Sequence, residues 1–315
     1  PPVAVSLPRS LSPSGRVAVV APASAALDAA DAATGLAALR ARGLQVDVAD
    51  VTGGPIAYLS GSDAARAGAL NAALRRDDVD ALVCLRGGYG LLRILDRIDY
   101  EAARAHPKLI VGYSDITALH LALWTEAGLT GVSGPMVASD WAKGLDADTE
   151  ADFWRVVGGD AGYDVRGPGG EALTPLAEGE AEGVLLGGNL ALVTALLGTP
   201  YLPDLTGAIL FVEDVGEAPY RIDGMLARLR LAGVLERLGG LVFGLFTDAD
   251  VPPDRPTFSV DEVLAQYAPY VGGPVASGLV YGHVPRKSTL PVGVRARLTC
   301  DDRAATLHVL DSVTG

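Results

Sequence analysis

One serine of this chain stands where a protein can present a nucleophile. The segment KLIVGYSDITALHLAL, residues 108–123, predicts a short buried strand, a four-residue turn and a helix, with Ser114 where the chain reverses. The start of a helix supplies a positive dipole end and unpaired N–H groups, and the N–H of Asp115 is the obvious donor to an oxyanion. An ordinary helix N-cap is the alternative, because Ile116 replaces the last glycine of the G-x-S-x-G elbow.

A glycine-rich turn, RGGYG at residues 86–90, offers a second oxyanion donor. It follows a predicted strand over 81–85, and turns at the carboxyl ends of parallel strands share one edge of a sheet. Gly87 and Gly88 carry no Cβ, so their backbone can approach a substrate closely, and we expect the N–H of Gly88 to act with that of Asp115. A dinucleotide-binding turn is the alternative, but no G-x-G-x-x-G and no ribose-binding acid follow.

A serine nucleophile needs a base, and only four histidines are available. His120 lies six residues beyond the serine on the same predicted helix, His106 precedes a proline, and His308 is in a terminal strand. His283 follows an apolar strand and enters a loop rich in glycine and proline, where catalytic groups are often held. We therefore favour His283 as the base, with a loop histidine that only donates a hydrogen bond as the alternative.

The histidine needs a carboxylate to orient it. The strand predicted over 208–212 is continuously apolar, so Glu213 emerges at its C-terminal edge. Asp214 and Glu217 compete for the role, and any of the three acids can be a solvated loop charge or a helix cap. Glu213 is favoured, and the chain order serine, glutamate, histidine matches that of the α/β-hydrolases.

Short buried strands that alternate with helices must position these residues. Such alternation in the first half predicts an α/β domain with a parallel sheet and helices on both faces. Residues 161–182 are rich in Gly, Pro, Glu and Asp and are expected to be a linker between domains 1–160 and 183–315. The second domain is expected to be mixed α/β with more antiparallel pairing.

Composition excludes several classes of function. The net charge of −13 leaves no basic stripe to neutralise phosphates, which disfavours nucleic acid and membrane partners. The apolar stretches 183–197 and 238–246 are short of the ~20 residues that span a bilayer. Cys84 and Cys300 have no metal-ligand spacing, so a zinc site or disulfide framework is disfavoured. A cytoplasmic location is the default expectation.

Six segments in order resemble one family, the LD-carboxypeptidases and their relatives that degrade the antibiotic microcin C. The matching segments cover nearly the whole chain: VAVVAPAS (17–24), RGGYG (86–90), GYSDITALH (112–120), GGNLALVTALLGTPYLPD (187–204), FVEDVGEAPYRIDGML (211–226) and GHVPRKSTLPVG (282–293). The resemblance implies a serine peptidase whose Ser-Glu-His triad carries over onto Ser114, Glu213 and His283. It also implies a flavodoxin-like N-terminal domain, a smaller C-terminal mixed α/β domain, a homodimer, and neither metal nor cofactor.

A carboxypeptidase must also recognise a free carboxylate, for which cationic or N–H-rich groups are needed. Within the matched segments, candidate cations are Arg86, Arg221, Arg286 and Lys287. The resemblance adds Gly188 and Asn189, and the glycine turn adds Gly87, as substrate-binding positions.

The substrate expected from the resemblance is murein tetrapeptide, from which terminal D-alanine would be released during cell-wall recycling. A microcin-type peptidase acting on aminoacyl or peptidyl nucleotides is the alternative, and it needs an aromatic surface for a base. Trp141 and Trp154 are candidates for that surface, although Trp154 is more easily explained as a packed helix residue. A non-catalytic protein that binds a small ligand is the alternative of another class, disfavoured because all three triad residue types are present.

Overall fold

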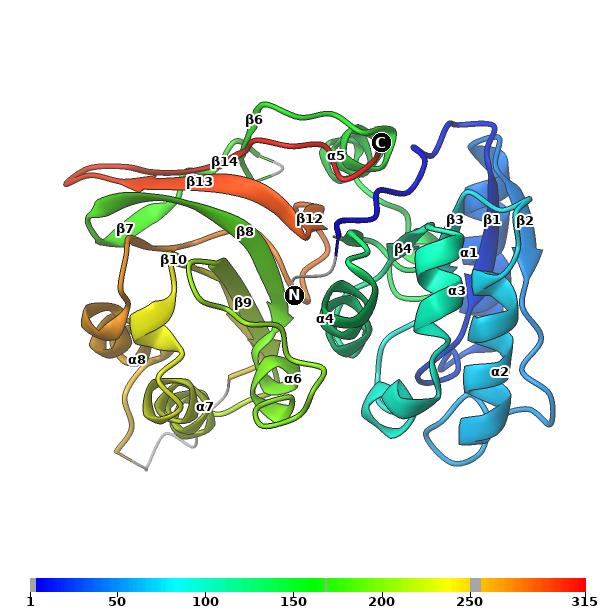
Figure 1. The fold of residues 1–315 in the computed structure, drawn as a ribbon, viewed down its shortest axis with the longest axis horizontal. Coiled ribbons are helices and arrows are strands. Elements are labelled where there is room, and N and C mark those ends of the chain that lie inside the picture. The colour runs from blue at the N-terminus through cyan, green and yellow to red at the C-terminus, as the bar shows by residue number, and fades with distance from the viewer. Residues whose placement is uncertain (1–3, 168, 250–255) are drawn as a thin grey trace. The chain divides into compact units, whose positions relative to one another are not determined.

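The chain divides into two compact units, each built on one sheet (Figure 1). The structure is a computed structural model that describes residues 4–167, 169–249 and 256–315. The first unit contains the chain up to Asp160 together with Thr289–Gly293 and Ser312–Gly315. The second contains the described residues of Ala161–Ser288 and Val294–Asp311.

The first unit has a six-stranded sheet with the order β12-β5-β4-β3-β1-β2. Its strands are β1 (Arg16–Val20), β2 (Gln45–Val48), β3 (Ala81–Cys84), β4 (Leu109–Val111), β5 (Gly131–Ser133) and β12 (Leu290–Val292). All neighbours pair in parallel except β12, which runs antiparallel to β5 at the edge. Apart from the edge strand β2, the parallel strands are short, apolar and buried, as expected where helices cover both faces.

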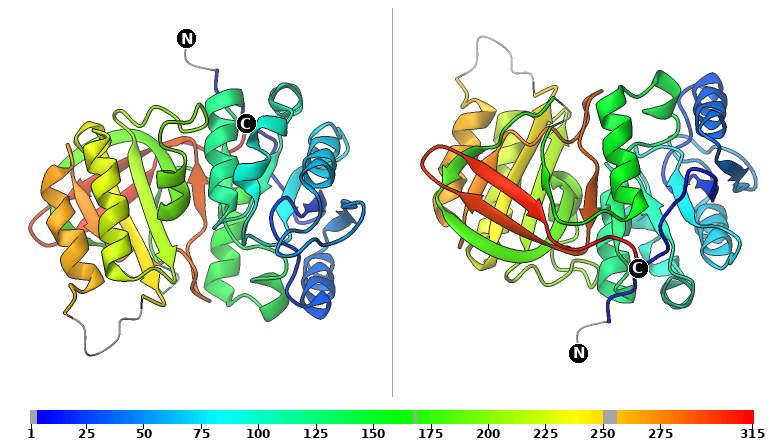
Figure 2. Two further views of the ribbon diagram at one scale, coloured as in Figure 1. Left: turned by 90° about the horizontal axis from the view of Figure 1, so that it is seen from below. Right: turned by 90° about the horizontal axis from the view of Figure 1, so that it is seen from above.

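Helices of the first unit connect these strands, and Figure 2 shows α1 and α2 on opposite faces of the sheet. The helices are α1 (Ala29–Ala41), α2 (Asp63–Leu74), α3 (Tyr100–Ala105), α4 (Ile116–Ala127) and α5 (Ala147–Gly158), with 3₁₀ turns η1 (Leu91–Arg93), η2 (Leu95–Arg97) and η3 (Trp141–Lys143). Side chains of Asp28, Ser62, Asp99 and Asp146 cap four of them. Helix α4 is apolar around its circumference and almost wholly buried, and it ends at Gly128 in the left-handed conformation.

The second unit has an eight-stranded mixed sheet with the order β6-β14-β13-β8-β9-β10-β11-β7. Its strands are β6 (Tyr163–Val165), β7 (Thr174–Ala177), β8 (Gly179–Asn189), β9 (Ile209–Val215), β10 (Gly240–Thr247), β11 (Val275–Ser277), β13 (Val294–Cys300) and β14 (Ala305–Val309). The central strands β8, β9, β10 and β11 are parallel, and the outer pairings are antiparallel. Its helical segments are α6 (Leu190–Ala195), α7 (Pro219–Leu231), η4 (Leu235–Arg237), α8 (Val260–Tyr267) and η5 (Ala268–Tyr270). Helices α7 and α8 lie side by side on one face of the sheet (Figure 2).

The α/β fold class and the mixed second sheet agree with expectation, while two details of the organisation differ. Residues 161–182 are not a linker: they contain β6, β7 and the start of β8, with residue 168 outside the described residues. The outer half of β8 is largely exposed, so its strand residues are polar and resemble a linker in composition. The expected second domain, 183–315, also loses Thr289–Gly293 and Ser312–Gly315 to the first unit, where β12 makes the otherwise parallel sheet mixed.

Within the described part of the chain, no helix combines the length and apolar character needed to cross a membrane.

Candidate active site

Ser114 occupies a strained turn in the first unit. It follows β4 and precedes α4, and its φ of 65° is in the left-handed region that residues other than glycine rarely adopt. Asp115, at the N-cap position of α4, makes no capping hydrogen bond with its side chain. This backbone strain is typical of a nucleophile elbow and is not required by a simple helix cap.

The glycine turn lies directly against this serine. A Cβ placed on Gly87 would be 2.9 Å from Ser114 Cβ and 3.1 Å from its Oγ. Gly88 has a φ of 97°, and a Cβ there would be 2.4 Å from Ser24 Oγ. Ser24 fixes the turn twice, because its N–H donates to the Gly87 carbonyl (3.2 Å) and its Oγ accepts from the Tyr89 N–H (3.1 Å). The turns expected to share one edge of the sheet therefore do so, and only glycine fits at both positions.

The side chain of Asp115 joins the two turns. Its Oδ2 accepts a hydrogen bond from the Leu91 N–H at 2.9 Å, and the residue is 2% exposed. Burial raises the pKa of Asp115 from 3.8 to about 6, against the lowering effects of that hydrogen bond and of Arg66. Burial of this carboxyl group thus disfavours its charged form.

This raised pKa predicts a measurable dependence of stability on pH. Between pH 4 and 6 the folded state holds a proton on Asp115 that the unfolded state has released, so this contribution to stability grows as pH falls from 7. We expect Asp115→Asn, which keeps an acceptor for Leu91, to lose about 1 kcal/mol of the gain between pH 7 and pH 5. Urea unfolding of parent and variant at both pH values measures it, and equal pH dependence would contradict the raised pKa.

In the second unit, Glu213 and His283 form a directed pair. Glu213 lies on β9 and is completely buried, and its Oε2 is 2.8 Å from Nδ1 of His283, whose side chain is 22% exposed. In the neutral ring this contact holds the proton on Nδ1, so that Nε2 is the basic nitrogen. Glu217 instead forms an ion pair with Arg221, in which Glu217 Oε2 is 3.7 Å from Arg221 Nε. Of the competing acids, it is Glu213 that contacts the histidine.

Asn189 and Asp214 support this pair from behind. The Nδ2 of Asn189 donates to Glu213 Oε1 at 3.3 Å and to Asp214 Oδ1 at 2.9 Å, while its Oδ1 caps α6 by accepting from the Leu192 N–H. Asp214 Oδ2 accepts from the Ala191 N–H, and burial raises the pKa of Asp214 to about 6. Asn189 is 4% exposed, so the structure gives it a role in holding Glu213 that the sequence did not suggest.

The remaining substrate-binding candidates are distributed over both units. Gly188 is buried on β8, opposite Val212 of β9. Arg86, beside the glycine turn, donates from Nη1 to the Ala25 carbonyl at 3.3 Å. Arg286 is half exposed, with Nη1 3.9 Å from Glu171 Oε1.

Two other cationic candidates differ in exposure: Arg221 is largely exposed in its ion pair with Glu217, whereas Lys287 is buried. The role of any of these groups in binding substrate stays a prediction.

The other histidines have structural surroundings. His120 is buried on α4, its Nε2 is 2.9 Å from the Gly112 carbonyl oxygen, and burial lowers its pKa to about 4. His106 and His308 each contact an aspartate, Asp77 and Asp164 respectively. None of these three contacts the buried carboxylate that His283 contacts.

A model of the LD-carboxypeptidase N-terminal domain matches residues 17–134, and one of the LD-carboxypeptidase C-terminal domain matches residues 182–298. The chain belongs to the LD-carboxypeptidase family. The two matched ranges include all six short segments, so the resemblance noted from them is confirmed across both units of this LD-carboxypeptidase.

Individual relatives cover almost the whole chain. A probable murein peptide carboxypeptidase of Bacillus subtilis is 36% identical over 96% of this chain and 94% of its own length. The murein tetrapeptide carboxypeptidase of Pseudomonas aeruginosa is 32% identical over 90% and 93%. The crystal structure of muramoyltetrapeptide carboxypeptidase from Oxalobacter formigenes superposes with a TM-score of 0.85 at 32% identity, covering 94% of this chain and 99% of that one.

A structure of MccF with glutamyl sulfamoyl guanosine has a TM-score of 0.88 at 23% identity, over 98% and 99% of the two chains, and shows the same fold.

Proposed function

We propose that this protein is a serine LD-carboxypeptidase that releases terminal D-alanine from murein tetrapeptide. The observation that carries the proposal is the 2.8 Å contact between His283 Nδ1 and the buried Glu213, because a serine hydrolase needs such an oriented histidine. The strained φ of Ser114 supports this serine as the nucleophile that the histidine would activate. The choice of substrate rests on the names of relatives whose match covers at least 90% of this chain.

In the proposed reaction, Ser114 Oγ attacks the carbonyl carbon of the L,D-peptide bond and His283 Nε2 takes the hydroxyl proton. The N–H groups of Gly88 and Asp115 stabilise the oxyanion, and His283 returns the proton to the leaving D-alanine amine. Water, deprotonated by the same histidine, then releases the acyl group from Ser114. Glu213 holds the tautomer and stabilises the imidazolium.

Recognition of the free carboxylate is assigned to Arg86. It belongs to the glycine turn that lies against Ser114, and a guanidinium can bind a carboxylate with two N–H groups. Arg286 is the second candidate, with Gly87, Gly188 and Asn189 as further substrate-binding positions.

D-alanine release from murein tetrapeptide tests the proposal. The purified chain is incubated with tetrapeptide, with the same peptide ending in L-alanine and with tripeptide, and free alanine and peptide mass are followed together. We expect loss of one alanine from the first peptide alone. A folded protein that releases no D-alanine would exclude the murein assignment.

An aminoacyl nucleotide belongs in the same experiment as the alternative substrate. Trp141 is 1% exposed and packs against Phe153, so it offers no open surface for a base, while Trp154 is partly exposed and packs against the same Phe153. Tyr58 and Tyr89 are exposed and pack edge to face with ring centroids 5.3 Å apart, and Tyr89 belongs to the glycine turn. Cleavage of the nucleotide in place of the tetrapeptide would move the assignment to the microcin-type peptidases.

We also propose a homodimer and a cytoplasmic location, with murein peptide as the partner and no nucleic acid or membrane partner. Sedimentation of the purified chain tests the first, and fractionation of the source cells tests the second.

The glycine before the histidine gives a matched pair of variants. Gly282 has a φ of 121°, and a Cβ there would be 2.6 Å from Glu213 Oε2. We expect Gly282→Ala to lower kcat at least about tenfold by displacing that carboxylate. Gly224→Ala, within α7 and with nothing within 4 Å of the new Cβ, should keep full activity and gain up to about 1 kcal/mol of stability. Equal activity of the two variants would contradict the dependence on Glu213 geometry.

A further inference from the structure

A buried arginine of the first unit has no part in the mechanism above. Arg66 lies on α2 and is 0% exposed. Its Nη1 donates to two backbone carbonyls, those of Pro22 and of Gly90, the latter at 3.0 Å. Its Nη2 donates to Asp63 Oδ1 at 2.7 Å. One guanidinium thus links a helix to two turns that are 68 residues apart in the chain, from position 22 to position 90.

This arrangement is costly for a purely structural residue. A buried charge must be compensated by a partner, and a buried N–H without an acceptor costs stability. Among the described residues, Arg66 Nε has no hydrogen-bond partner. Asp63 is shared, because it also accepts two hydrogen bonds from Arg93, whose side chain is 45% exposed. An apolar side chain of similar size would avoid these costs, so the contacts to the two carbonyls need another explanation.

One carbonyl belongs to the glycine turn, which lies against Ser114, and the other to the turn that holds the glycine turn in place. The turn after Pro22 holds the glycine turn through Ser24, by the two hydrogen bonds described above. Gly90 closes the glycine turn with a φ of 131°, and a Cβ there would be 2.9 Å from Arg66 Nη1. The guanidinium and Leu59 Cδ2, at 2.6 Å from that Cβ, therefore occupy the space that a side chain of Gly90 would need.

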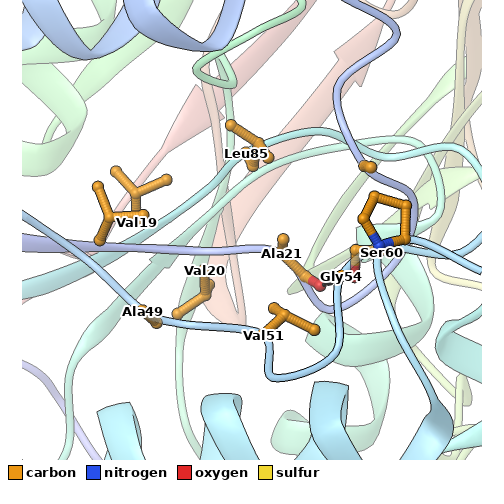
Figure 3. A pocket seen from close by; sticks show the side chains of 11 residues that line it. Val19, Val20, Ala21, Ala49, Val51, Gly54, Ser60 and Leu85 are labelled. Atoms are coloured by element: carbon orange, nitrogen blue, oxygen red, sulfur yellow. Dashed lines mark hydrogen bonds between the residues drawn. The ribbon is translucent and has the colours of Figure 1, made fainter. Parts of the chain in front are cut away.

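The turn after Pro22 has further anchors: the Ser60 N–H donates to the Ala23 carbonyl at 3.0 Å and Arg86 Nη1 to the Ala25 carbonyl at 3.3 Å. The turn also borders an apolar pocket of about 220 Å³, lined by Ala21, Ala25 and Leu85 among others (Figure 3). From the rim of this pocket, Ser60 Oγ donates to the Ala21 carbonyl at 2.5 Å. Arg66 differs from these donors because its guanidinium also reaches the Gly90 carbonyl, at 3.0 Å.

We propose that Arg66 is a positioning residue for catalysis: by bridging the carbonyls of Pro22 and Gly90, it fixes the turn that presents the Gly88 N–H to the oxyanion. The inference rests on the proposed function, since it needs an oxyanion at Ser114. Arg66 itself contacts neither substrate nor reacting atoms. Its effect is on transition-state stabilisation, because an oxyanion donor acts only when the tetrahedral intermediate forms.

The test compares Arg66→Met with Arg93→Met, which removes the other arginine on the same Asp63 but no turn contact. With tetrapeptide as substrate, we expect Arg66→Met to lower kcat about 10- to 100-fold with KM changed less than about threefold. Arg66→Lys, which keeps a donor and the charge, should recover part of kcat. Arg93→Met should keep kcat within about twofold of the parent.

Hydrogen exchange separates this inference from the proposed function. Peptides covering residues 21–25 and 86–91 should exchange faster in Arg66→Met than in the parent, and should be unchanged in Arg93→Met. If the parent releases no D-alanine, the function proposal fails and exchange alone decides the positioning role. If Arg66→Met does not fold, the same two measurements on Arg66→Lys decide it.

Unchanged exchange at both turns overturns the inference, as does a folded Arg66→Met with the kcat of the parent. An equal kcat loss in Arg93→Met also overturns it, because the effect would then arise from Asp63.

Discussion

Replacement of Ser114 by alanine is expected to abolish D-alanine release from murein tetrapeptide, with a loss in kcat of at least about 10⁴-fold. The reason is that no other group would then form the acyl intermediate, and only binding and oxyanion stabilisation would remain. The strained φ of 65° supports this role, since a residue held in the left-handed region at a strand-to-helix turn is explained by function more readily than by folding. Alanine removes the hydroxyl alone, so the tetrapeptide should still bind.

A helix-start serine of the second unit provides the matched control. Ser259 caps α8 through a capping box with Glu262. Ser259→Ala should cost about 1 kcal/mol of stability and leave kcat unchanged, as expected of a serine that only caps a helix. A fluorophosphonate should label the parent and Ser259→Ala at one site and fail to label Ser114→Ala. Retained hydrolysis by a folded Ser114→Ala would assign the nucleophile elsewhere.

The local elements of this fold could be predicted because their signals are short-range. Helix α4 (Ile116–Ala127) follows the turn at Ser114 as predicted, since an apolar stretch runs from that turn to a glycine C-cap. Glu213 could be assigned to a buried strand because the preceding residues are uniformly apolar, although β9 continues two residues beyond Glu213, to Val215.

Two classes of feature could not be predicted in the same way. The exposed part of β8 has a polar composition, so it resembles a linker in the sequence. It pairs with β13, which lies far later in the chain, so no local pattern reveals the strand. The support that Asn189 gives Glu213 and that Arg66 gives the two turns depends on contacts 24 to 44 residues apart. One feature of the structure points to the role of Arg66: it is an arginine on the buried face of helix α2.

Glu213→Gln is expected to lower kcat about 10³- to 10⁴-fold with little change in fold, because it reverses the tautomer of His283. Asn189 Nδ2 donates to Glu213 Oε1, so a glutamine at this position would turn its carbonyl oxygen toward Asn189. Its NH₂ would then face His283 Nδ1, only 2.8 Å from the present carboxylate oxygen. To accept that hydrogen bond, the neutral ring must carry its proton on Nε2, where it can no longer take one from serine.

The matched control is Glu217→Gln, which changes the same charge four residues on but removes only an exposed ion pair with Arg221. Its kcat should stay within about twofold of the parent. Steady-state kinetics with tetrapeptide, together with the ring ¹⁵N shifts of His283, measure both the loss and the tautomer. Full activity in Glu213→Gln, or a large loss in Glu217→Gln, would show that the carboxylate contacting His283 in this structure is not the one that catalysis uses. A large loss with the Nδ1 proton retained would instead assign Glu213 a purely electrostatic role in stabilising the imidazolium.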